Sequence, residues 1–205
     1  MNKKLVFNNG ISSVEKHTFY HGSNIEIKDG FLRPKQNFNH VQNGRVSGAF
    51  ITSNSDYAKF FAIGSCITGR GFIRLDGNKI YFEKLSNNIQ KFFYIYTVYE
   101  DPEKPFIHDH GTEYYSEQPI KIFKKTKYNV AKEIEKLGYE IYVLDEPLKN
   151  KPDKEHHNNF AQQHEMDDRI KNKKYHRVDI SKTIEQQSDN IFKTIFKKIF
   201  NKQNS

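Results

Sequence analysis

The sequence predicts a fold of mainly short strands with a few helices. Short segments rich in β-branched and aromatic residues recur between turn residues, and the densest is Phe92–Tyr99, which contains only Phe, Tyr, Ile, Thr and Val. Helical patterns are fewer. The chain becomes polar after Pro147, so we expect a domain at residues 1–147 and, at 148–205, a polar linker followed by a helical tail.

Turn residues and periodicity place the expected elements along the chain. Strands are expected at 17–21, 49–52, 72–75, 79–83, 92–99, 113–123 (interrupted at Pro119) and 139–144. Residues 35–48 are polar and contain glycine, which predicts a loop, and 100–111 are expected to form another. One helix is expected from Asp56 to near Gly64, and a second at 129–137, ended by Gly138.

The tail is expected to contain an amphipathic helix at 189–200. Six large apolar residues share one side of this helix and lysines occupy the other. Such a stripe has to be buried, either by docking on the chain's own domain, or in a partner groove, or on a membrane surface.

Composition limits the class of protein. The net charge is +8, but residues 1–147 carry only 20 Lys and Arg against 17 Asp and Glu, so basicity is a weak argument for a nucleic-acid partner. The single cysteine, Cys66, excludes an internal disulfide framework and is read as structural. No apolar stretch suits a signal peptide or a transmembrane segment, so we expect a cytoplasmic protein unless a dedicated system exports it.

Three segments carry residues suited to chemistry. Tyr20-His21-Gly22-Ser23 ends the first strand, Phe50-Ile51-Thr52 leads into the helix bearing Phe60, and Thr112-Glu113-Tyr114 begins a late strand. Their order, with 39 residues from His21 to Phe60 and 53 more to Glu113, resembles the ADP-ribosyltransferase superfamily. The likeness is to the His-Tyr-Glu branch, typified by diphtheria toxin and the poly(ADP-ribose) polymerases, and spans roughly residues 17–144.

The resemblance implies an α+β fold of two small packed sheets with a few flanking helices, and NAD as substrate. It implies that His21 binds a ribose hydroxyl, that Gly22 and Ser23 hold the nicotinamide, and that Glu113 is the catalytic carboxylate. The remaining expected NAD contacts are two aromatic ring walls, a further helical aromatic and a phosphate-binding arginine: Phe50, Phe60, Tyr57 and Arg33. The acceptor of ADP-ribose, protein or nucleic acid among others, stays open.

These residue types suit cleavage of a nicotinamide–ribose bond. The reaction develops positive charge on the ribose, which a carboxylate stabilises, as in glycoside cleavage. Aromatic rings on both faces of nicotinamide fix its orientation and exclude water. We therefore expect a mono-ADP-ribosyltransferase. Its likeness to toxins adds the possibility of delivery into a host or target cell as an effector.

Two departures from the branch bear on this expectation. Phe60 stands where relatives have Tyr, and Gly111 stands where arginine-modifying enzymes have an acidic residue or Gln, which disfavours arginine as acceptor. Two alternatives stay open: an RNA 2′-phosphotransferase-like enzyme that uses NAD, and an interaction module that kept the fold without catalysis. The modest charge of residues 1–147 argues against the first, and an intact Glu113 against the second.

Histidine-rich segments suggest a metal site, but no metal is expected. His108-Asp109-His110 and His156-His157 both lack the ligand count of a closed zinc site, and the second pair lies in the polar linker. For His21 alone the simpler alternative is a histidine that caps a turn, for Phe50 and Phe60 it is core packing, and for Glu113 it is a solvated strand edge.

Overall fold

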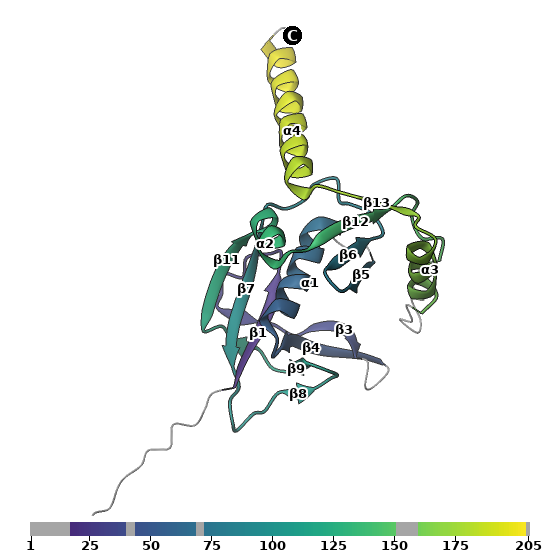
Figure 1. Cartoon of the computed structure of the whole chain (residues 1–205). Helices are drawn as coiled ribbons and strands as arrows, with labels where there is room; N and C mark the ends of the chain where they lie inside the picture. The colour runs from purple at the N-terminus through teal and green to yellow at the C-terminus, as the bar shows by residue number, and fades with distance from the viewer. Residues whose placement is uncertain (1–16, 40–43, 69–71, 151–159, 204–205) are drawn as a thin grey trace, which may run out of the picture.

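The computed structural model describes residues 17–39, 44–68, 72–150 and 160–203, and shows an α+β fold (Figure 1). The expected coarse class is therefore confirmed. None of the helices in these ranges combines the length and apolar composition needed to cross a bilayer. Most of the expected linker, together with residues 1–16, lies outside the described residues.

The larger sheet is antiparallel throughout and has the strand order β11-β7-β1-β4-β9-β8, with β3 paired to β4. The strands are β1 (Thr18–Ser23), β3 (Lys35–Asn39), β4 (Gly44–Thr52), β7 (Phe92–Tyr99), β8 (Ile107–His108), β9 (Glu113–Ser116) and β11 (Lys124–Asn129).

A second, four-stranded sheet has the order β13-β12-β6-β5, in which β12 and β6 run parallel. A two-stranded ribbon of β2 and β10 lies apart from both sheets in the pairing pattern. These strands are β2 (Phe31–Leu32), β5 (Ile73–Asp76), β6 (Lys79–Phe82), β10 (Ile120–Lys121), β12 (Glu140–Leu144) and β13 (Tyr175–Arg177).

Helix α1 (Ser55–Thr68) lies between the two sheets (Figure 1). Its buried residues pack with β7 on one side and with β6 and β12 on the other, which produces one continuous core. Helix α2 (Val130–Leu137) closes this core; the side chain of Asn129 caps it, and Gly138 ends it in the left-handed conformation. Members of the core include Ile63, Ile67, Ile80, Phe93, Ile95, Val130, Ile141 and Ile180.

The opposite face of the larger sheet has its own apolar cluster, in which the ribbon β2–β10 covers β1, β4 and β7. Its buried residues are Phe19, Leu32, Ala49, Ile51, Tyr96, Val98 and Ile120. Strand β1 therefore alternates between two cores, with Phe19 in this cluster and Tyr20 against the α1 core.

Several expected elements need correction. Residues 35–39 and 44–48, expected in a loop, are strand, because β3 and β4 pair antiparallel from Lys35↔Gly48 to Asn39↔Gly44. Helix α1 continues to Thr68, four residues beyond Gly64. The expected strand 113–123 is two separate strands, β9 and β10, and the strand β11 follows them.

Residues beyond 147 belong to the same packed structure. Strand β13 pairs with β12, Leu148 and Met166 pack with Tyr81, and Ile180 enters the α1 core. Helix α3 (Phe160–Lys171) precedes β13, and α4 (Ile180–Gln203) follows it. Residues on both sides of position 147 therefore share packed clusters, and the expected division there stays a prediction.

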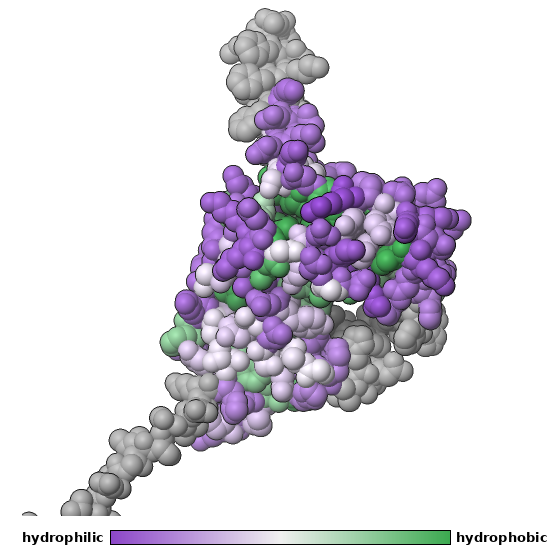
Figure 2. Space-filling view, in the orientation of Figure 1, coloured by the Kyte–Doolittle hydropathy of each residue, from purple (hydrophilic) through white to green (hydrophobic). Residues whose placement is uncertain are grey.

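The helix expected at 189–200 is the second half of α4, which extends away from the sheets (Figure 1). The side chains of its apolar stripe lie outside the described residues. The face drawn in Figure 2 is mainly hydrophilic, and its apolar atoms gather mostly near the base of α4.

A buried ion pair joins α1 to α2. The Lys59 Nζ lies 3.0 Å from Glu133 Oε1, with side chains only 12% and 7% exposed. Burial lowers the pKa of Lys59, but hydrogen bonds and charge from Glu133 and Asp56 outweigh it and raise that pKa. The lysine is therefore held charged against the carboxylate.

We predict that Glu133→Ala destabilises the protein by about 3 kcal/mol, because it leaves the Lys59 cation without its buried partner. Urea unfolding followed by circular dichroism measures the change. Lys136→Ala is the control. Lys136 is 70% exposed, and its Nζ lies 4.0 Å from the same carboxylate, farther than the Lys59 Nζ. Equal effects of the two variants would contradict the assigned role of the ion pair.

Candidate functional site

The three motif segments lie on adjacent strands. Tyr20 of β1 is opposite Thr52 of β4, and Thr52 is in turn opposite Glu113 of β9. The register therefore brings residues that are 32 and 61 positions apart in the sequence into one row across the sheet. Pairing of this kind depends on tertiary structure, which the spacing of the motifs alone does not determine.

Strand alternation directs His21 and Glu113 to opposite faces of this sheet. Residues directly opposite each other share a face, so Tyr20, Thr52 and Glu113 face α1. His21 has the other parity and lies opposite Tyr96, which belongs to the cluster beneath the β2–β10 ribbon. The β1–β4 ladder ends at the Tyr20–Thr52 pair. A ligand that contacts both His21 and Glu113 therefore has to lie beyond this pair, across the two strands.

The imidazole of His21 links β1 to β4 beyond that pair. Its Nδ1 lies 2.7 Å from the carbonyl oxygen of Phe50. Because a carbonyl only accepts, Nδ1 carries a proton, and Nε2 of the neutral ring is then an acceptor. Burial lowers the pKa of His21; the hydrogen bond to Phe50 acts in the opposite direction, and the charge of Lys35 adds a smaller lowering. The ring is therefore neutral at physiological pH.

Gly22 is the point of closest approach between β1 and α1. A Cβ at this position would lie 1.9 Å from the carbonyl oxygen of Ala58, so no other residue fits without moving the helix. The neighbouring Ser23 accepts a hydrogen bond from the backbone N–H of Ile25 at 3.0 Å, which stabilises the turn after the strand. The fold therefore accounts for both Gly22 and Ser23 without reference to any ligand.

The aromatic residues expected to hold nicotinamide have different environments. Phe50 is half-buried and stacks on the buried ring of Tyr115 with centroids 5.4 Å apart. Phe60 is only 6% exposed and packs in the α1 core, so it offers little surface to a ligand. Tyr57, one turn earlier, stacks on Phe60 with ring centroids 6.1 Å apart and is only partly buried against the same core.

Glu113 lies at the start of β9, with its side chain 19% exposed. It forms a hydrogen bond with the hydroxyl of Tyr57; burial first, and then this carboxylate, raise the pKa of Tyr57. Nearby, the hydroxyl of Thr52 donates to that of Thr112 at 3.0 Å, which ties β4 to the turn before β9. The structure therefore joins the expected carboxylate to Tyr57, and not to Phe60.

Arg33 is the remaining expected contact. It forms an ion pair with Asp29 at 2.8 Å, and both side chains are about half exposed or more, at 62% and 47%. A phosphate that uses Arg33 has to compete with this carboxylate, although a pair so exposed is held only weakly.

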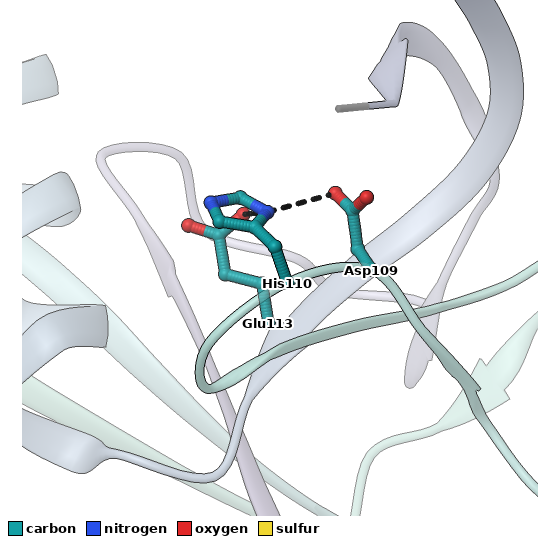
Figure 3. A group of neighbouring side chains, drawn as sticks. All are labelled: Asp109, His110 and Glu113. Atoms are coloured by element: carbon teal, nitrogen blue, oxygen red, sulfur yellow. Dashed lines mark ion pairs between the residues drawn. The ribbon is translucent and has the colours of Figure 1, made fainter. Parts of the chain in front are cut away.

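Two residues beside Glu113, Asp109 and His110, were considered from the sequence only as metal ligands and set aside; Figure 3 shows all three residues together. Asp109 Oδ2 and Glu113 Oε2 lie 3.4 and 3.7 Å from His110 Nδ1. Gly111, with φ of 53°, allows the tight turn that brings them together. The signal in the sequence was the short run Asp-His-Gly-Thr-Glu at 109–113, with glycine at its centre.

Comparisons of the chain with protein-family models, curated proteins and solved structures find no match. The function is therefore argued from the residues and their geometry.

We predict that Gly22→Ala destabilises the protein by at least about 2 kcal/mol, because the added methyl group has to push α1 away from β1. Thermal and urea unfolding measure the loss. Ser23→Ala is the matched control, and it should cost only about 1 kcal/mol, since it removes one turn hydrogen bond. A stable Gly22→Ala protein would mean that α1 does not pack as closely as described.

We predict that His21 titrates below its ordinary pKa of 6.5. When the pH falls through the unfolded-state pKa, the unfolded chain binds a proton that the folded imidazole does not. This group therefore reduces stability progressively as the pH falls from 6.5 to its folded pKa. NMR titration of the ring protons measures that pKa directly.

The same linkage can be checked by unfolding. His21→Asn keeps a donor for the Phe50 carbonyl and does not titrate, so it should lose less stability than wild type between about pH 7.5 and about pH 5.5. A His21 pKa at or above 6.5 would contradict the burial of the neutral ring.

Proposed function

We propose that this chain is an NAD-dependent mono-ADP-ribosyltransferase. The observation that carries the proposal is the row Tyr20–Thr52–Glu113, which places all three motif segments on neighbouring strands. Support also comes from the chemistry of the side chains around this row.

Glu113 is suited to stabilise positive charge. Its carboxylate is largely buried, accepts from the Tyr57 hydroxyl and lies beside the α1 core, so water screens its charge less than at an open surface. In the proposed reaction the bond between nicotinamide and the ribose C1′ breaks, and its electron pair leaves with neutral nicotinamide. The oxocarbenium-like ribose then forms a bond to a nucleophile of the acceptor.

His21 is suited to bind a neutral polar group. Its Nδ1–H is fixed by Phe50, which orients the ring and makes Nε2 an acceptor for a ribose hydroxyl. In this proposal the NAD ribose lies across the end of the β1–β4 ladder, between His21 and Glu113, with Phe50 packing against nicotinamide. Gly22, Ser23 and Arg33 keep the subsidiary binding roles that the resemblance implies.

Tyr57 takes the place proposed for the second aromatic wall. Phe60 is in the core, where a missing hydroxyl has no bearing on a ligand. Phe at position 60 therefore gives no support to the alternative of an inactive interaction module. The acceptor and the cellular location follow from none of these contacts.

We predict that the purified protein releases nicotinamide from NAD, and that Glu113→Gln lowers the rate at least about a hundredfold by removing the charge that stabilises the ribose cation. Release is measured by chromatography with cell lysate supplied as acceptor. Labelled NAD in the same reaction would reveal the acceptor class.

Glu117→Gln is the matched control, because Glu117 directly follows the same strand but is exposed. It should retain the wild-type rate. An equal loss in both variants, or no release by the wild-type protein with lysate present, would contradict the proposed function.

A further inference from the structure

We propose that Asp109, His110 and Glu113 form a binding site for a divalent transition-metal ion, of which Zn²⁺ is the best fit. The three residues offer one ligand atom each, and these atoms all lie within 4.8 Å of one another. They comprise one imidazole nitrogen and two carboxylate oxygens, a set that suits zinc and related ions better than Mg²⁺ or Ca²⁺, which prefer oxygen alone.

Two of the three ligand separations lie near those of a zinc site, and the third is within 4.8 Å. In a tetrahedral site with bonds of about 2.0–2.1 Å, ligand atoms lie about 3.3 Å apart. His110 Nδ1 is 3.4 Å from Asp109 Oδ2 and 3.7 Å from Glu113 Oε2. Small rotations of the side chains therefore bring the ligands to bonding distance. Three protein ligands also leave a fourth position for water or another small ligand.

The backbone holds the three residues in place. Asp109 N–H donates to the Glu113 carbonyl at 2.9 Å, and Glu113 N–H donates to the His110 carbonyl at 2.8 Å. All ligands come from one five-residue turn between β8 and β9, so little chain entropy is lost when an ion binds. The site is thus largely formed before binding.

Burial gives the cluster a reason to attract a cation. The Asp109 side chain is fully buried and that of Glu113 is 19% exposed, so water screens the attraction between these carboxylates and a cation only weakly. The 44% exposure of His110 leaves an approach from solvent.

An ion at this position would use the carboxylate that the proposed reaction needs. In the part of this inference that rests on the proposed function, Zn²⁺ neutralises Glu113 and inhibits nicotinamide release. Binding itself is independent of that function, so the two are tested separately.

We predict that the full-length protein, treated with chelator and then titrated with Zn²⁺ in a calorimeter, binds one ion, and that Mg²⁺ produces no comparable heat. Co²⁺ should give the intense visible absorption of a tetrahedral site. His110→Ala and Asp109→Asn should each weaken Zn²⁺ binding at least about tenfold. Mutation of a residue outside the first coordination sphere already lowers metal affinity by about that factor.

His164→Ala is the matched control, because His164 is an exposed histidine on α3, and it should bind Zn²⁺ as wild type does. Wild-type protein that binds no Zn²⁺, or binding that survives in both cluster variants, would overturn the proposal. If a cluster variant does not fold, NMR of the wild type decides: the His110 ring signals have to shift with Zn²⁺, and unchanged signals overturn the site.

Inhibition is measured as the ratio of rates with and without Zn²⁺ for each variant. Zn²⁺ binding without any nicotinamide release would overturn the enzyme and leave the metal site intact. Release that Zn²⁺ does not affect, in a protein that binds the ion at His110, would overturn the inhibitory role alone.

Discussion

The close packing of α1 on β1 at Gly22 is the constraint on which the rest of the structure depends. The Ala58 carbonyl occupies the space where a Cβ would lie, so the helix sits directly against the strand. That position allows Ile63 and Ile67 to fill the space between the two sheets. It also sets the first turn of α1 close enough to β9 for Tyr57 to reach Glu113. One glycine thus serves the core and the candidate site together.

The sheet imposes a second constraint through alternation. Because His21 and Glu113 have opposite parity, they serve one ligand only where β1 and β4 stop pairing. At that position the His21 imidazole forms a hydrogen bond with the Phe50 carbonyl, which the β1–β4 ladder does not use. A strand end that needs a side chain to complete its hydrogen bonding is a reasonable place for a substrate to bind, since backbone and side-chain groups are both near.

The sequence predicted best the elements whose signals are local. Strand β7 is dense in β-formers, and α2 has its own capping residues at Asn129 and Gly138. The strand pair β3–β4 was missed because its residues are polar, and only their pairing makes them strands. Likewise, local pattern could not decide which helical aromatic is buried, since Tyr57 and Phe60 are one turn apart and packing alone places Phe60 in the core. The proximity of Asp109 and His110 to Glu113 required the turn geometry.

Glu113 belongs to both proposals, the ADP-ribosyl transfer and the metal site, and it cannot serve both at the same time. A carboxylate that stabilises a ribose cation has to stay negatively charged and accessible, whereas a bound divalent ion uses its lone pairs and neutralises it. The two states are therefore mutually exclusive at this residue. Tyr57 approaches the carboxylate from α1, while His110 approaches from the turn after β8. NAD and the ion would thus draw on different neighbours of the same group. Competition at Glu113 follows directly from this arrangement, and no conformational change elsewhere in the chain is needed for one ligand to exclude the other.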